Sequence, residues 1–271
     1  MLDQLVVLAA GVAAGAINAV VGSGTLITFP VLLALGYPPV VANASNTVGL
    51  VPGSLSGAYG YRAELVGRRR LLLPLMLVGL VGGVTGAALL LVLPATAFEF
   101  VVPWLIGVAV LLVAAQPRLA RWLRRSRTPD GVREPAGSRT PGATPPGPTG
   151  RLPGGRAGVL LLVGAYGTSV YGGYFGAAQG VLLLGVLGVL LPEKLQSLNG
   201  IKNLLTALVN GVAAVVFLGA GQVAWQPALL IAAGSVVGGL LGARYGRRLP
   251  DTALRALIVA VGLTALVRMA T

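Results

Sequence analysis

The chain has 271 residues, of which 55% are hydrophobic and 10% are charged, and its mean hydropathy is +0.86. Soluble domains carry roughly 25% charged residues, so this composition excludes an ordinary soluble enzyme and predicts an all-α polytopic protein of the cell membrane. Long apolar runs that do not alternate exclude a transmembrane β-barrel. The net charge of +13 does not indicate nucleic-acid binding, because the arginines lie in loops between apolar runs, as membrane orientation requires.

Ten apolar segments are expected along the chain. The first half contains 4–21, 24–36, 41–60, 71–93 and 98–116, and the second half contains 158–174, 177–191, 196–218, 226–243 and 251–268. Segments 24–36 and 177–191 are short, because a helix of about 13 residues spans about 20 Å of a hydrocarbon core of about 30 Å. Each is expected to be a half-helix or one arm of a re-entrant hairpin. The total is therefore 8–10 segments, depending on whether the short ones merge with their neighbours.

The stretch 117–156 between the halves differs from both in composition. It holds nine arginines, eight prolines and seven glycines and no long apolar run, which is typical of a disordered segment. The expected organisation is a first transmembrane repeat at 1–116, a basic cytoplasmic linker at 117–156 and a second transmembrane repeat at 157–271.

A polar stripe occurs twice, 156 residues apart, inside apolar segments. The first copy is Asn43, Asn46, Thr47 and Ser54, and the second is Asn199, Lys202, Asn203, Thr206 and Asn210. The spacings of three, four, seven and eleven place each set on one helical face. Polar groups in hydrocarbon face protein, water or a substrate. The stripes therefore predict one pathway built from two related halves, although Asn and Thr also often bond only to neighbouring helices.

Other residues repeat with the same offset. Gly82-Gly83 and Gly86-Ala87 match Gly238-Gly239 and Gly242-Ala243, and Leu93-Pro94 matches Leu249-Pro250. These glycines predict close helix packing.

The charges at the loops do not repeat. Arg68–Arg70 correspond to the uncharged Ala224–Gln226, whereas the basic cluster of the second half, at 244–248, lies one segment later. Under the positive-inside rule this predicts halves inverted in the membrane, with an odd number of crossings in each half, five plus five, and both termini outside. The alternative is eight helices in two parallel sets.

A candidate anion site lies where glycines interrupt the apolar segments. Gly22, Ser23, Gly24 and Thr25 precede one short segment, and Gln179-Gly180 opens the other. A helix beginning there would direct its positive end and its free backbone N–H groups toward the middle of the bilayer. Packing alone is the alternative role of these glycines.

Lys202 is the cation placed farthest inside an apolar segment, and none of the seven carboxylates is an obvious partner. A charge at the bilayer centre costs about 3 kcal/mol on insertion scales. The missing counter-charge is either a substrate anion or, if Lys202 lies near the cytoplasmic edge, lipid phosphate reached by snorkelling.

Catalysis and metal binding have little support in the sequence. The chain lacks cysteine and histidine, which excludes disulfides, thiolate sites and imidazole chemistry. No Walker loop or paired intramembrane carboxylates occur. We expect no enzyme activity, no metal and no cofactor. With no intramembrane acid relay, anion export would follow the membrane potential, which contributes about 2.3 kcal/mol per charge per 100 mV.

Several motifs together resemble the TauE/SafE sulfite exporter family. The first repeat of that family is similar to Gly22–Pro30, Leu35–Pro39 and Ala42–Thr47, and its second repeat is similar to Leu198–Asn203, Val209-Asn210 and Gly238–Pro250. Members usually carry three glycines where this chain has Gly22-Ser23-Gly24. The resemblance implies transport of small sulfur-containing anions, such as sulfite or sulfonates, across the cytoplasmic membrane.

The sequence therefore predicts a multi-pass secondary transporter or facilitator of a small anion. Its site would comprise Gly22, Ser23, Gly24, Thr25, Asn43, Asn46, Thr47, Gln179, Asn199, Lys202, Asn203, Thr206 and Asn210. Its partners would be the anion and the lipid bilayer, with no nucleic acid, and a homo-oligomer is possible. The alternative is a membrane-embedded assembly or chaperone protein that transports no solute.

Overall fold

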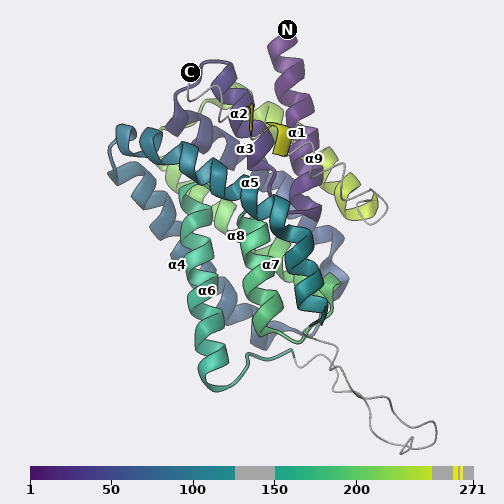
Figure 1. Cartoon of the computed structure of the whole chain (residues 1–271). Coiled ribbons are helices and arrows are strands. Elements are labelled where there is room, and N and C mark those ends of the chain that lie inside the picture. The colour runs from purple at the N-terminus through teal and green to yellow at the C-terminus, as the bar shows by residue number, and fades with distance from the viewer. Residues whose placement is uncertain (126–149, 246–258, 262, 265–271) are drawn as a thin grey trace, which may run out of the picture.

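The structure, a computed structural model, describes residues 1–125, 150–245, 259–261 and 263–264, and within these the backbone is helical with no strand (Figure 1). The first half contains α1 (Leu2–Val20), α2 (Thr25–Ala34), α3 (Pro39–Gly60), the 3₁₀ turn η1 (Arg62–Leu65), α4 (Arg69–Val92) and α5 (Ala95–Arg125). The second half contains α6 (Gly155–Tyr174), α7 (Gln179–Leu190), α8 (Leu195–Gly219) and α9 (Trp225–Tyr245). The prediction of an all-α fold is confirmed.

Five helices in the described residues are long and apolar enough to cross a membrane, namely α1, α4, residues 95–115 of α5, α8 and α9. The helices α3 and α6 are 22 and 20 residues long, but their polar and glycine residues lower their hydropathy. Large apolar side chains such as Leu73 on α4 and Trp104 on α5 are exposed on the outer surface, where lipid rather than water is the compatible solvent. The chain is a multi-pass membrane protein.

The boundaries of the helices repeat along the chain. The helices α3 and α8 begin at Pro39 and Leu195, and α4 and α9 begin at Arg69 and Trp225, so both pairs are 156 positions apart. The counterpart of α5 is the predicted segment 251–268, which lies outside the described residues apart from the helical positions 259–261 and 263–264. The basic residues at 247–248 also lie outside them.

The two halves interlock rather than form separate domains. Helix α1 packs mainly on α9, and α6 packs mainly on α4, so the first helix of each half lies against the fourth helix of the other. Helices α3 and α8 cross between these pairs. The matched glycines allow the close approach: a Cβ at Gly82 or Gly86 would collide with the backbone of α6, and a Cβ at Gly238 or Gly242 would collide with the backbone of α1. The packing role predicted for these glycines is confirmed.

The two short helices, α2 and α7, are separate elements. Each forms a hairpin with the helix before it, α1 or α6, and runs back toward the end of the molecule where that helix began. Leu35 and Tyr37, just after α2, lie beside Met1 and Asp3 at the start of α1, and Gln226 at the start of α9 reaches the same place. We call this the N-terminal end. Helix α2 has 10 residues and α7 has 12, about half a membrane crossing each. They are therefore hairpin arms rather than full crossings.

The opposite end of the molecule carries most of the described cations. The α3–α4 loop, the α7–α8 turn and residues 150–151 meet there, through the Arg68–Glu193 ion pair and a hollow lined by Arg69, Arg70 and Arg151. We call this the basic end. Helix α5 continues to Arg125, past the predicted boundary at residue 116, so the first part of the predicted linker is helical. Residues 126–149 of that linker lie outside the described residues, and its last two residues belong to α6, which begins at Gly155.

Candidate functional site

Two helix breaks of the same construction lie at the ends of α1 and α6. The N–H groups of Val21 and Gly22 both donate to the Ile17 carbonyl, at 2.7 and 3.0 Å. In the second half, those of Phe175 and Gly176 both donate to the Tyr171 carbonyl, at 2.9 and 3.1 Å. Gly22 and Gly176 have φ of +87° and +77°, the left-handed conformation that ends helices and that glycine adopts without steric cost.

The two breaks touch each other in the interior. The N–H of Gly180 donates to the carbonyl of Gly22 at 3.0 Å, and a Cβ at Gly22 would lie 2.5 Å from the Gly180 Cα. Helix α2 begins at Thr25 and α7 begins at Gln179, so two helix N-termini lie close together. Each contributes a partial positive charge of about half an elementary charge, although the N–H groups of Gln179 and Val181 in the first turn of α7 already donate to the carbonyls of Gly176 and Ala178.

Lys202 crosses from α8 to the break in the first half. Its side chain is fully buried, and its ammonium donates to the carbonyls of Asn18, Ala19 and Val20 at 3.4, 3.2 and 3.4 Å. These are the last carbonyls of α1, which no turn of the helix satisfies. Lys202 therefore does not snorkel to the membrane surface, and its partners are backbone carbonyls rather than a carboxylate.

The polar stripe of each half serves the helix break of the other half. From α8, the amide of Asn203 also donates to the Ala19 carbonyl, at 3.2 Å. From α3, the amide of Asn43 donates to the carbonyl of Tyr174, the last residue of α6, at 3.0 Å. Broken helix ends inside a membrane need such partners, because neither lipid nor the helix itself supplies them.

The stripe residue that corresponds to Lys202 behaves differently. Asn46 on α3 bonds within its own half, donating to Thr25 at 3.2 Å and accepting from the hydroxyl of Thr28. One break is thus capped by a full positive charge and the other by a neutral amide.

Repeat-related residues meet where α3 and α8 cross. Ser54 accepts from Asn210, its counterpart 156 residues later, at 3.3 Å, and from Asn18 at 3.0 Å. The two predicted stripes are therefore brought together in the interior, through positions that are equivalent in the 156-residue repeat.

Several polar atoms at this centre are buried without a hydrogen-bond partner. They include the Ser23 hydroxyl at the start of α2 and both amide atoms of Gln179 at the start of α7, and these side chains are 0% and 1% exposed. The hydroxyl of Thr206 and the amide oxygens of Asn43 and Asn199 are also unpartnered. Buried polar groups without partners are uncommon in native proteins and need an explanation. Thr47, the remaining predicted stripe residue, is also buried.

A buried ion pair at the basic end was not apparent from the sequence. The Arg68 guanidinium lies 2.5 Å from the Glu193 carboxylate and donates to the Ser197 hydroxyl at 3.1 Å. It joins the α3–α4 loop of one half to the α7–α8 turn of the other. The repeat-related positions at the N-terminal end are Ala224 and Tyr37, and there the Ala224 N–H donates to Ser45 at 2.8 Å. The separation of 125 residues between Arg68 and Glu193 concealed the pairing.

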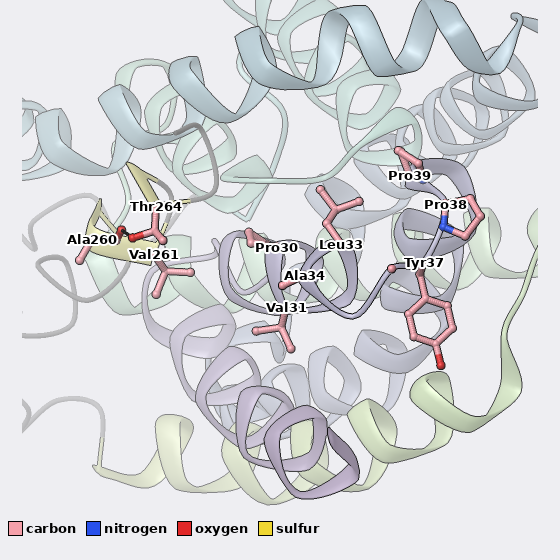
Figure 2. Close-up of a pocket in the computed structure, with 11 residues that line it drawn as sticks. Pro30, Val31, Leu33, Ala34, Tyr37, Pro38, Pro39, Ala260, Val261 and Thr264 are labelled. Carbon is pink, nitrogen blue, oxygen red and sulfur yellow. Dashed lines mark hydrogen bonds between the residues drawn. The ribbon is translucent and has the colours of Figure 1, made fainter. Parts of the chain in front are cut away.

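A cavity of about 870 Å³ lies on the outer side of α2 (Figure 2). It is lined by Pro30, Val31, Leu33 and Ala34 of α2, by the turn at 36–39 and by Ala260, Val261 and Thr264, and nearly all of these side chains are apolar. None of the stripe residues contributes to its wall. It is therefore separate from the polar centre.

Comparison of the chain with known proteins identifies its family. The profile of the sulfite exporter TauE/SafE family matches residues 7–269. The chain belongs to the sulfite exporter TauE/SafE family. The "probable membrane transporter protein" of Haemophilus influenzae is 27% identical over 260 residues, covering 95% of this chain and 91% of that protein.

Two further relatives agree with this assignment. The "probable membrane transporter protein ORF9" of Sinorhizobium sp is 25% identical, covering 94% of this chain and 88% of its own length. The "probable membrane transporter protein YfcA" of Escherichia coli K12 is 27% identical, covering 87% and 76%. No solved structure matches the chain. The family and these names identify the chain as a membrane transporter.

Proposed function

We propose that this transporter is a secondary carrier or facilitator that exports small sulfur-containing anions of the sulfite or sulfonate type. The observation that supports it best is a pair of buried, unpartnered polar side chains where two helices meet inside the molecule: Ser23, two residues before α2, and Gln179, the first residue of α7. Hydroxyl and amide donors beside two helix N-termini suit an oxyanion. The name of the family supplies the sulfur chemistry.

The binding centre, as proposed, lies between the two helix breaks. Ser23, Thr25 and Gln179 donate to the anion from the starts of α2 and α7. The stripe residues hold the broken helix ends in place around the anion. The Lys202 side chain passes Gly180 to the end of α1, and its charge makes the electrostatic potential at the centre more positive. These side chains are buried, so the anion would reach them only when one end of the molecule opens.

Inverted halves form part of the proposal. Helix α1 starts at the upper end of Figure 1 and its counterpart α6 starts at the lower end. The α3–α4 loop lies at the basic end, whereas the corresponding α8–α9 loop lies at the N-terminal end. With a hairpin and three crossings in the first half, the second half begins on the opposite side. The positive-inside rule places the basic end in the cytoplasm.

Thiol labelling tests this orientation, because the chain contains no cysteine. Val66→Cys in the α3–α4 loop and Gln222→Cys in the α8–α9 loop are expected to react with a membrane-impermeant reagent from opposite sides. Labelling of both positions from the same side would contradict inversion.

Transport itself is tested in vesicles reconstituted with the purified chain. Labelled sulfite, thiosulfate, a sulfonate and sulfate are compared with and without an imposed membrane potential. We expect at least one sulfur anion to move faster than in empty vesicles, and faster still when the potential drives negative charge outward. A flux that requires a proton gradient and does not depend on voltage would contradict the proposal that the membrane potential drives export. No flux of any anion, together with a stable protein partner in pull-downs, would favour the assembly alternative.

A further inference from the structure

The cage of three carbonyls at the end of α1 has the features of a cation site. The carbonyl oxygens of Asn18, Ala19 and Val20 converge on the Lys202 nitrogen, and each lies 3.2–3.4 Å from it. An ammonium has three N–H donors, so the three acceptors use all of them. The negative end of the α1 dipole points at the same place. The negative dipole end and the three converging acceptors therefore suit a monovalent cation that donates three hydrogen bonds.

The route of the lysine side chain shows how the cage is filled. Lys202 starts on α8, and its Cδ lies 3.1 Å from where a Cβ on Gly180 would be. The stem thus passes the start of α7 before reaching α1. The Lys202 side chain therefore connects α8 with α7 and α1, and α7 and α1 belong to opposite helix breaks. The corresponding residue of the first half, Asn46, makes no such connection.

We propose that the end of α1 is a cation site that the chain occupies with its own Lys202 ammonium. The tethered charge takes the place that a soluble coupling cation would otherwise fill, so this site contributes no cation dependence in the native chain. Removing the stem and the charge together vacates the site for a small primary ammonium ion. The proposal concerns the stability of the α1 break and holds whatever anion is transported.

Chemical rescue tests this directly. Lys202→Ala deletes the atoms that correspond to propylammonium. We expect the purified variant to melt at least about 5 °C below the native chain in detergent. Propylammonium chloride should restore half or more of the loss. Tetramethylammonium chloride, which has the charge but no donors, and propanol, which has a similar shape but no charge, should restore little.

Two controls make each outcome decisive. Lys194→Ala removes an exposed lysine at the start of the same helix and should neither lower the melting temperature nor respond to propylammonium. Lys202→Met retains the apolar stem without the charge, so it should melt lower than the native chain, or fail to fold, and should not respond because its stem fills the space. A Lys202→Met variant as stable as the native chain would overturn the proposal. So would a folded Lys202→Ala variant that is not rescued, or that tetramethylammonium rescues equally.

Discussion

The two helix breaks share their backbone construction and differ in their charge. Both end a helix with two N–H groups on one carbonyl and a left-handed glycine. The first break is capped by Lys202 and the second by the neutral Asn43. The same contrast holds at the two ends of the molecule, where the basic end carries the buried Arg68–Glu193 pair and the N-terminal end has Ala224 and Tyr37 at the related positions. Duplication supplied the backbone framework, and the charges distinguish the two halves.

The largest difference in stability is expected between substitutions at the two ends of the molecule. Arg68→Ala removes the guanidinium from a buried carboxylate and should destabilise the fold by about 3–5 kcal/mol. Ser45→Ala removes the hydroxyl that accepts from Ala224 at the other end, and should cost about 1 kcal/mol. Thermal unfolding in detergent measures both. Equal losses would show that the ion pair does not distinguish the two ends.

A smaller difference is expected between the glycines of the two breaks. Gly22→Ala places a methyl group 2.5 Å from Gly180 in a left-handed residue, so strain and overpacking together should cost about 2–4 kcal/mol. Gly176→Ala has the same backbone strain, but its nearest neighbour is the Gly172 carbonyl oxygen at 3.0 Å, and it should cost about 1–2 kcal/mol. Melting temperatures of the two variants rank them. If Gly176→Ala were the more harmful, the breaks would not meet at Gly22 and Gly180 as described.

The smallest expected effect lies in the second break. Ala178 has φ of +58°, and Gly176 has a positive φ two residues earlier. Ala178→Gly relieves the strain of a left-handed alanine, of about 1 kcal/mol, and loses part of that gain because glycine makes the unfolded chain more flexible. We expect a net stabilisation of about 0.5 kcal/mol, visible as a slightly higher melting temperature. A lower one would indicate that the alanine methyl group supports the start of α7.

Much of this fold could be predicted from composition and spacing. The apolar segments and the short segments follow from residue types at regular positions, and the structure confirms those that lie before residue 246. The starts of α3 and α8, and those of α4 and α9, also keep the predicted offset of 156. The end of α5 could not be predicted. Its basic residues at 118–125 mark where the apolar run stops, but arginine is a good helix former, so the helix continues beyond that point.

The contacts of the site could be predicted only in part. The polar stripes were apparent because their side chains are polar at helical spacing. The partners of Lys202 were not, because they are backbone carbonyls that a helix break frees, and no residue type identifies a carbonyl. For the same reason the exchange of caps between the halves, through Asn43 and Asn203, appears only once the helices are placed in space.

Flux through a Gln179→Leu variant tests the central claim, a polar centre at the meeting of α2 and α7 that binds the anion. Leucine is similar in size to glutamine but has no polar atoms, and the native amide is already unpartnered, so the melting temperature should be retained or higher. Loss of a hydrogen bond to a charged ligand, worth about 1.5–3 kcal/mol, should reduce the flux of the best-transported anion about 10- to 100-fold in reconstituted vesicles. Gln196→Leu, on the first turn of α8, serves as the control and should transport normally. Equal flux through Gln179→Leu and the native chain would contradict the account.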